Sequence, residues 1–398
     1  MSQTPPSPCK TRLMRSGSVI VLALVLVCGP GARAEDWTRP RSEPVLPQPT
    51  YANSGWPACV PDDDELQGFG AAGDRGSSSG GWGAFPRLPG LRGVRGLTGV
   101  IGNLLQTNPH IGATFYPDQP VSGQPTDLGM TREFFQFSAP VWSKGQDTLA
   151  FSTHVQETSV STNAILPTTM TPFPDQLWNI WVGLNYFHTF DNGITGALIV
   201  EGGSASDKPF SAARNDSAAG TGLVIIPAGN RDAWILGLQA STNSQVLYGI
   251  PIPGAAYLYN PSDDFQAIIG LPYSAINYYP HRDFQLQLLY MFLTTIHTRA
   301  IYKPTNDGQL YVGYDWTNEN YDLASRQASD DRFFYYEMRV LAGGQWFFSK
   351  HFAVELVGGY AFNRYFVENN GFSFSLSGFN RVNVGNGPFV TLQFDYRF

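Results

Sequence analysis

The chain has 398 residues and a formal net charge of −7, with aromatic and charged residues each at 14%, where about 25% charged residues is usual. An acidic chain has no electrostatic basis for binding nucleic acid. Its three cysteines, two of them before residue 35, are too few for a disulfide framework or a cysteine metal site.

Residues 1–34 have the three-part layout of a secretory signal peptide. Basic residues precede an apolar run at 19–27, and the small residues Ala32 and Ala34 precede the expected cleavage site. The apolar run is too short for a transmembrane helix, which needs about 20 apolar residues. Cleavage after Ala34 would leave 21 basic and 32 acidic residues, a net charge of −11.

Residues 35–109 are predicted to be a largely disordered periplasmic segment. The segment is rich in Pro, Gly and Ser and carries the acidic run 62–65, so apolar burial could not offset the entropy cost of ordering it. Within it, residues 91–105 have apolar residues at helical spacing. We expect either a short helix capping the barrel described below or a poorly ordered lead-in.

From residue 110 onward the sequence predicts alternating β-strands. Leu286 and Leu288 alternate with Gln285 and Gln287, so one face is apolar and the other polar. Clusters of Pro, Asn, Asp and Ser between such runs are typical of hairpin turns. Candidate strands lie near 110–116, 132–142, 147–158, 177–190, 193–203, 219–227, 231–242, 253–260, 264–271, 273–280, 283–294, 296–303, 309–318, 333–348, 351–364 and 388–398.

This pattern favours an all-β fold, an antiparallel up-and-down transmembrane β-barrel over residues 110–398. We expect about 14 strands, with 12–16 permitted and an even number preferred. The connections near 159–176, 204–218, 319–332 and 365–387 are predicted to be extracellular loops. Tryptophans near strand ends, such as Trp142, would form an aromatic girdle at the membrane surface. A soluble β-sandwich is the alternative, since its strands also bury one apolar face.

The last ten residues carry the strongest signal. Apolar and polar residues alternate without a break, and Phe394, Tyr396 and Phe398 end the apolar series. This ending resembles the terminal strand of bacterial outer-membrane β-barrels. The resemblance implies that these three residues are the signal read by the barrel assembly machinery, and that the protein lies in the outer membrane.

The hairpin sequence also resembles an outer-membrane barrel family of unknown function. The resemblance rests on 270–273, Tyr279-Pro280, Asp283-Phe284 and the closing Phe398. It implies a location and no particular reaction. A barrel similar to fatty-acid transporters is the second interpretation, with residues 91–105 as the segment that would enter the lumen.

The polar face of the predicted strands would line the lumen. It combines amides with charges of both signs, which does not indicate an ion-selective ring. The lumen-lining candidates are Asp264, Gln266, Asp283, Gln285, Gln287, Gln309, Asp315, Glu337, Arg339, Glu355, Gln393, Asp395 and Arg397.

These residues favour a passive pore for small solutes or a structural barrel with a polar, mixed-charge lumen. A hydrophobic-solute channel is one alternative. A secreted soluble binding protein and an outer-membrane acyl hydrolase built on His154 or His297 are others. We expect no cofactor and no metal, because no histidine pair has metal-ligand spacing, and we expect no enzymatic activity.

Overall fold

The computed structural model describes residues 109–229, 231–244, 249–326, 328, 330–349, 351–370 and 379–396. All of them belong to the second of two units, Val60–Phe398. The predicted signal peptide with Ala32 and Ala34, the predicted segment 35–109 except for its last residue, and the terminal Arg397 and Phe398 lie outside the described residues.

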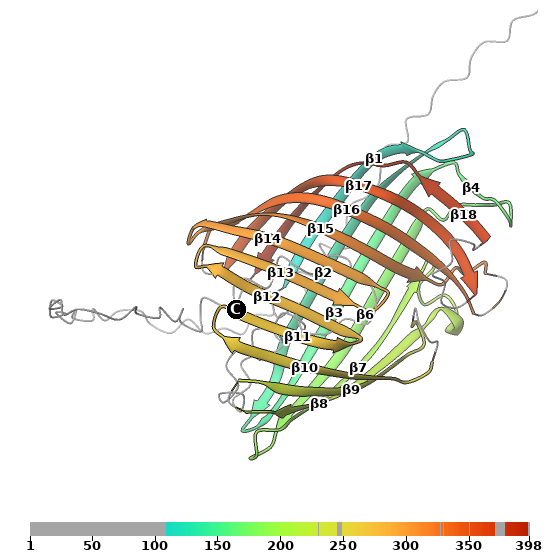
Figure 1. Ribbon diagram of the computed structural model, residues 1–398. Coiled ribbons are helices and arrows are strands. Elements are labelled where there is room, and N and C mark those ends of the chain that lie inside the picture. Colours follow the sequence, from blue (N-terminus) through green and yellow to red (C-terminus); the bar gives the residue numbers. More distant parts are fainter. Residues whose placement is uncertain are drawn as a thin grey trace, which may run out of the picture. The chain divides into compact units, whose positions relative to one another are not determined.

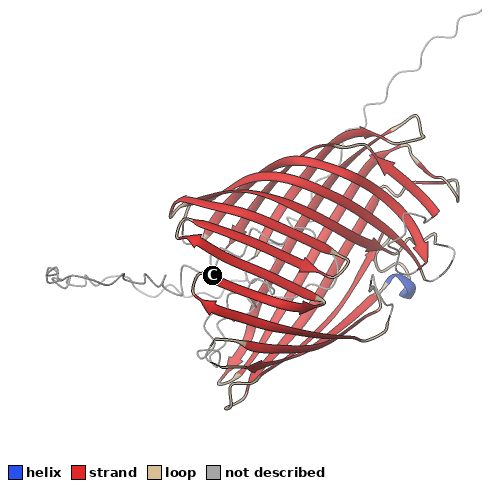
Figure 2. Cartoon of the chain, in the orientation of Figure 1, coloured by secondary structure: helices blue, strands red, loops and turns tan. Residues whose placement is uncertain are grey.

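One antiparallel sheet of seventeen strands accounts for most of the described chain (Figures 1 and 2). Consecutive strands are hydrogen-bonded neighbours, as in a meander. Its strands are β1 (His110–Pro120), β2 (Asp127–Lys144), β3 (Asp147–Thr162), β6 (Gln176–Thr189), β7 (Thr195–Ser206), β8 (Ser217–Pro227), β9 (Ala233–Ser241), β10 (Ile252–Ser262), β11 (Phe265–Leu271), β12 (Tyr273–His281), β13 (Phe284–Met291), β14 (Thr295–Thr305), β15 (Gly308–Tyr321), β16 (Asp331–Phe347), β17 (Phe352–Asn370), β18 (Phe379–Val384) and β19 (Gly387–Tyr396). A small hairpin, β4 (Ile165–Leu166) and β5 (Thr171–Pro172), and the short 3-10 helix η2 (Ala213–Asn215) lie in connections.

The sheet closes on itself between the first and last strands. β1 pairs with β19 from His110↔Asp395 to Phe115↔Val390. β18 and β19 both pair with β17, so they share one position around the barrel. The closed barrel therefore has sixteen positions, which lies within the expected range and is two above the central expectation of 14. Each of the sixteen candidate ranges overlaps one strand of the wall.

The two ends of the barrel differ in their connections. Short turns, such as 145–146 and 306–307, join strands at the end that also holds β1's first and β19's last residues. Longer connections at 163–175, 207–216 and 322–330 lie at the other end, which we call the loop end. The predicted loops were too long, because β3, β15 and β17 continue into them as paired strands.

The outer face of the barrel is apolar. Leu236, Leu238 and Val340 are 44–53% exposed, and the other outward positions of the strands carry similar side chains. Exposed apolar residues around a closed barrel require a lipid environment. The protein is therefore a transmembrane β-barrel of the outer-membrane type. The soluble-sandwich alternative is wrong, because the apolar faces do not pack against a second sheet.

Tryptophans near the short-turn end support the expected girdle. Trp142, Trp234 and Trp346 are each 46–49% exposed on the outer face. Not every tryptophan near a strand end belongs to the girdle, because Trp181 faces inward and is buried, and its indole N–H donates to Asn179 Oδ1 at 2.7 Å. Among the described residues, no helix has the length and apolar character needed to cross a membrane.

Candidate functional site in the barrel lumen

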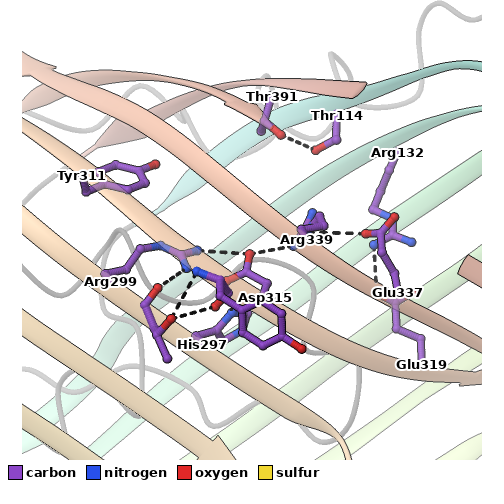
Figure 3. A network of polar contacts seen from close by, with 12 residues as sticks. Thr114, Arg132, His297, Arg299, Tyr311, Asp315, Glu319, Glu337, Arg339 and Thr391 are labelled. Carbon is purple, nitrogen blue, oxygen red and sulfur yellow. Dashed lines mark hydrogen bonds and ion pairs between the residues drawn. The ribbon is translucent and has the colours of Figure 1, made fainter. Parts of the chain in front are cut away.

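A continuous set of charged side chains lies on the inner face of β14–β17 and reaches across to Arg132 on β2 (Figure 3). Asp315 on β15 is its centre and is almost fully buried. Its carboxylate accepts hydrogen bonds from Arg299, from Arg339 Nη2 at 3.1 Å and from His297 Nδ1 at 2.9 Å. Neighbouring strands place these groups together, since His297, Asp315 and Arg339 are directly paired across β14, β15 and β16.

Glu337 on β16 is the second acidic centre. It accepts hydrogen bonds from the hydroxyls of Tyr116, at 2.8 Å, and Tyr335, at 2.6 Å. Arg364 Nε lies 3.3 Å from one of its oxygens and Arg339 Nε 3.4 Å from the other. Arg339 therefore links the two acidic centres.

Glu319, near the end of β15, completes the set. Arg132 Nη1 on β2 lies 3.0 Å from Glu319 Oε1, while the hydroxyl of Tyr321 donates to Oε2 at 2.7 Å. These ion pairs are strong because water is largely excluded, but each charge depends on its partner. We call the whole set the charged network: Arg132, His297, Arg299, Asp315, Glu319, Glu337, Arg339 and Arg364.

Local sequence features allow the arginines to lie along the wall. A Cβ atom on Gly313 would come within 2.3 Å of the Thr298 carbonyl oxygen and 2.7 Å of Arg299 Nη1. The glycine therefore leaves the space through which Arg299 reaches Asp315. Aromatic rings also support the guanidinium groups, as where Arg364 lies 4.7 Å from the centre of the Tyr116 ring.

A second polar layer lies nearer the short-turn end. Gln309 Nε2 donates to Gln345 Oε1 at 2.7 Å, and Gln345 Nε2 donates to Asp395 Oδ2 at 2.8 Å. Gln393 also donates to Asp395, and Glu355 accepts from Tyr311. This amide layer spans β15, β16, β17 and β19, so it crosses toward the seam with β1.

Part of the inner wall of β6–β12 is apolar, which the sequence did not indicate. Inward residues of β6–β12 form one buried cluster, which we call the apolar arc: Phe187, Ala197, Ile199, Ile225, Ala233, Ala256, Leu258, Ile268 and Ala275. Inward polar side chains such as Asn185, Glu201 and Asn277 interrupt this cluster, so the polar lumen expected from the sequence is mixed with apolar patches on these strands. The pairing Leu289↔His297 on β13 and β14 marks where the apolar wall meets the charged network.

Most of the predicted lumen-lining residues are placed on the inner face. Gln285, Gln309, Asp315, Glu337, Arg339, Glu355, Gln393 and Asp395 are inward and buried, while Gln266 and Gln287 are inward and half-buried. The structure brings Asp315, Glu337 and Arg339 into the charged network and Gln309, Glu355, Gln393 and Asp395 into the amide layer or its edge. Arg397 lies outside the described residues.

Two of the predicted lumen residues are not in the wall. Asp264 follows Asp263 in the turn closed by the pair Ser262↔Phe265, and Asp283 lies in the turn closed by His281↔Phe284. The strands begin one residue later than expected. Asp stabilises tight turns through its side chain, and this preference prevailed over the continuation of the alternating pattern.

The sequence reasoning missed Arg132, His297, Arg299, Glu319 and Arg364 as lumen residues. The signal was present for some of them. His297 and Arg299 alternate within the candidate strand 296–303, and Arg132 and Arg364 are terminal residues of their candidate strands. Glu319 lies one residue beyond its candidate strand, so only the true length of β15 could reveal it.

The histidines considered for an acyl hydrolase do not form a complete catalytic arrangement in the described part of the chain. His297 does have a carboxylate partner, Asp315. However, no hydroxyl or thiol of the described residues is hydrogen-bonded to His297 Nε2, nor to His154 Nε2, and a nucleophile needs that contact with its base. In the same part of the chain, no three His, Cys, Asp or Glu side chains gather as a metal ion would require.

No protein-family model matches the chain, and no curated protein matches its sequence. Similar solved structures include an outer membrane channel from Pseudomonas putida, 10% identical with a TM-score of 0.32 over 74% of this chain and 97% of that structure. The β domain of the Bordetella autotransporter BrkA is 10% identical with a TM-score of 0.27, over 73% and 100%. The CymD monoaromatic hydrocarbon channel is 11% identical with a TM-score of 0.28, over 79% and 98%. The assignment as a membrane barrel depends on the strand pairing and exposed faces of this chain itself.

Proposed function

We propose that the protein is a passive channel for small solutes across the outer membrane. The observation that carries this proposal is the polar inner wall of a closed barrel with sixteen strand positions. Barrels of about this size have an interior wider than the side chains of the wall alone can fill. Polar groups on the inner wall favour water and hydrophilic solutes in the remaining space.

Several polar atoms of the charged network are buried without a partner. Arg132 Nε, Arg299 Nε and His297 Nε2 have no hydrogen-bond partner among the described residues. Buried polar groups are rarely left without a partner, because each unsatisfied group costs about 1–3 kcal/mol. These atoms are closed off from solvent, so the charged network itself narrows the lumen and an aqueous path would run beside it.

The charge balance favours weak ion selectivity. Four arginines of the charged network face three carboxylates of the network, and Glu355 and Asp395 lie in the neighbouring amide layer. Strong selectivity requires a ring or a patch of a single sign. We therefore expect a small difference between cation and anion permeability.

Conductance in planar lipid bilayers tests the proposal. The refolded protein is expected to produce discrete current steps in potassium chloride, and proteoliposomes are expected to swell in small sugars. A protein sample boiled in detergent is the control. If folded, heat-modifiable protein gave no steps and no swelling, and no substitution at the loop end produced them, the barrel would be a sealed structural element and the proposal would be wrong.

A hydrophobic-solute channel is the second candidate, and the apolar arc favours it. An apolar solute moving along β6–β12 would contact side chains such as Ile199, Ile225 and Leu258. Uptake of an apolar solute into proteoliposomes, compared with uptake of a sugar, separates the two candidates. Selective loss of apolar uptake in Leu258→Ser would support this second function, whereas equal loss for both solutes would argue against it.

We also propose that the chain is exported and assembled as the sequence predicts. Residues 1–34 would be the signal peptide, residues 35–109 a periplasmic segment, and the loop end would face the exterior. Phe394 and Tyr396 face outward on β19, where the assembly machinery could bind them together with Phe398. Deletion of Phe398 is expected to lower the amount of heat-modifiable barrel in the outer membrane, while a Met1-to-Ala34 deletion should abolish export.

A further inference from the structure

The end of β15 extends beyond its partner strand β14. β14 and β15 remain paired only as far as Thr295↔Thr317, whereas β15 and β16 stay paired as far as Tyr321↔Phe333. Beyond the last pair with β14, residues 318–322 are all buried, although an ordinary wall strand buries alternate residues. Both faces of this stretch are therefore covered by protein. We call residues 318–326 the bridging segment.

The bridging segment reaches the opposite wall. β8–β14 separate β15 from β7 on one side, and seven strand positions also separate them on the other side, through the seam. Nevertheless, the Asp322 N–H donates to the Ala205 carbonyl at 2.7 Å, and Asp322 forms an isolated bridge with Ser206. The segment therefore spans the lumen at the loop end, from β15 to the end of β7.

Further side chains hold the segment along this path. Glu319 pairs with Arg132 on β2, while Asn320 Nδ2 donates to Asn243 Oδ1, at 2.7 Å, in the β9–β10 connection. The bridging segment thus contacts the barrel on three sides. Contacts on three sides together fix the position of the bridging segment across the mouth of the barrel. Pairing with a single neighbouring strand would not determine that position.

Arg326 forms the far anchor. Its Nη1 donates to Asn215 Oδ1 at 2.8 Å and to the Leu323 carbonyl at 3.0 Å, and its Nη2 donates to the Arg214 carbonyl. Nearby, the Ala324 N–H donates to Asp207 Oδ1 at 2.7 Å. These contacts join the segment to the β7–β8 connection. They are mostly hydrogen bonds of single side chains, which break more easily than a strand ladder.

The β3–β6 connection packs beside the bridging segment at the same end. The Phe173 ring lies 5.7 Å from the Phe333 ring and 4.9 Å from the Phe366 ring, both in edge-to-face contact. The backbone N–H groups of Thr168 and Thr169 donate to Asn380 Oδ1. The space beneath β16–β18 at this end is therefore occupied by the β3–β6 connection, which leaves less of the opening beside the bridging segment.

We propose that the bridging segment is a gate at the loop end, closed by its anchor on the β7–β8 connection. Residues 308–317 stay paired on both sides and provide the fixed base, while 318–321 stay paired with β16 alone, and the end of that pairing at Tyr321 provides the hinge. Release of the Arg326 and Asp207 contacts would let residues 322–326 move away from β7 while β15 keeps its pairing with β16. This inference rests on the proposed channel function.

Release of the anchor is the first test. Arg326→Gln removes the charge and most of the hydrogen bonds of the anchor. The open probability in planar bilayers is expected to rise by about tenfold, which corresponds to a loss of about 1.4 kcal/mol. Arg231→Gln is the matched control, because Arg231 is a half-buried arginine paired with Asp263 at the short-turn end. It should leave the open probability unchanged.

Locking the gate is the second test, and it does not depend on the stability of the first variant. Asp207→Cys together with Ala324→Cys would join the segment to the β7–β8 connection by a disulfide. Cys59→Ser would be added to remove the one native cysteine that remains after cleavage of residues 1–34. Oxidation is expected to reduce the mean current to below a tenth, and reduction should restore it. Heat-modifiable migration on gels verifies that each variant is folded.

The outcomes separate the gate from the channel. Wild-type steps that neither the release nor the lock alters would contradict the gate and leave the channel proposal intact. Steps that appear only after release would support both. Absence of current in the wild type, the release variant and the reduced lock variant, all of them folded, would contradict the channel and the gate with it.

Discussion

Replacement of Asp315 by Asn should destabilise the barrel strongly. The substitution keeps the shape of the side chain but removes the negative charge that faces Arg299, Arg339 and His297. All four side chains are at most 6% exposed, so water cannot replace the lost partner. Breaking a buried ion pair from one side costs about 3–5 kcal/mol, because the remaining charges stay buried without compensation. We expect a loss in this range.

Urea unfolding of the refolded protein in lipid vesicles, followed by tryptophan fluorescence, measures this change. Asp315→Asn should lower the midpoint without changing the urea dependence of the free energy of unfolding. Asp263→Asn is the matched control, since Asp263 is 48% exposed and also paired with an arginine, Arg231. It should cost less than about 1 kcal/mol. If Asp315→Asn also cost less than about 1 kcal/mol, the charged network would not be a desolvated structural unit.

Three further substitutions test separate parts of the structure. Leu392→Arg places a charge on the lipid-facing side of β19 and should cost about 2–4 kcal/mol if the residue lies near the middle of the membrane; vesicle refolding yields measure it, and a neutral effect would contradict the assignment of the outer face. Gly313→Ala should cost about 1–3 kcal/mol through overpacking, whereas Gly220→Ala, whose Cβ would meet nothing within 4 Å, should change the urea midpoint little; equal midpoints for both would argue against the close contact. Phe173→Ala removes two ring contacts and should make the β3–β6 connection the first site of limited proteolysis, while an unchanged cleavage pattern would show that this packing is dispensable.

The alternation of apolar and polar residues was sufficient to predict the wall of the barrel. In β19, Leu392 and Phe394 face outward while Gln393 and Asp395 are buried inside, as the period of two requires. This works because lipid and lumen select opposite side chains at every strand position. The number of strands was harder to predict. Two short strands joined by a turn of one or two residues have nearly the same sequence pattern as one long strand.

The interior arrangement could not be predicted in the same way. Alternation identifies the inward residues, such as Asp315 and Arg339, but their pairing depends on register between strands that are distant in sequence. The bridging segment departs from alternation, since residues 318–322 are all buried, and its polar residues resembled a loop. The apolar arc was missed because small and apolar inward residues, such as Ala197 and Ile199, weaken the contrast between the two faces of β7.

A cross-link at the barrel seam tests the central claim, a closed cylinder in the membrane, most directly. Thr114 on β1 and Thr391 on β19 are paired, and their hydroxyl oxygens lie 2.8 Å apart. With cysteine at both positions, oxidation of the refolded protein in vesicles should form an intramolecular disulfide in nearly every molecule. Failure to cross-link in a folded, heat-modifiable protein, or cross-linking only between molecules, would contradict the closure of the barrel.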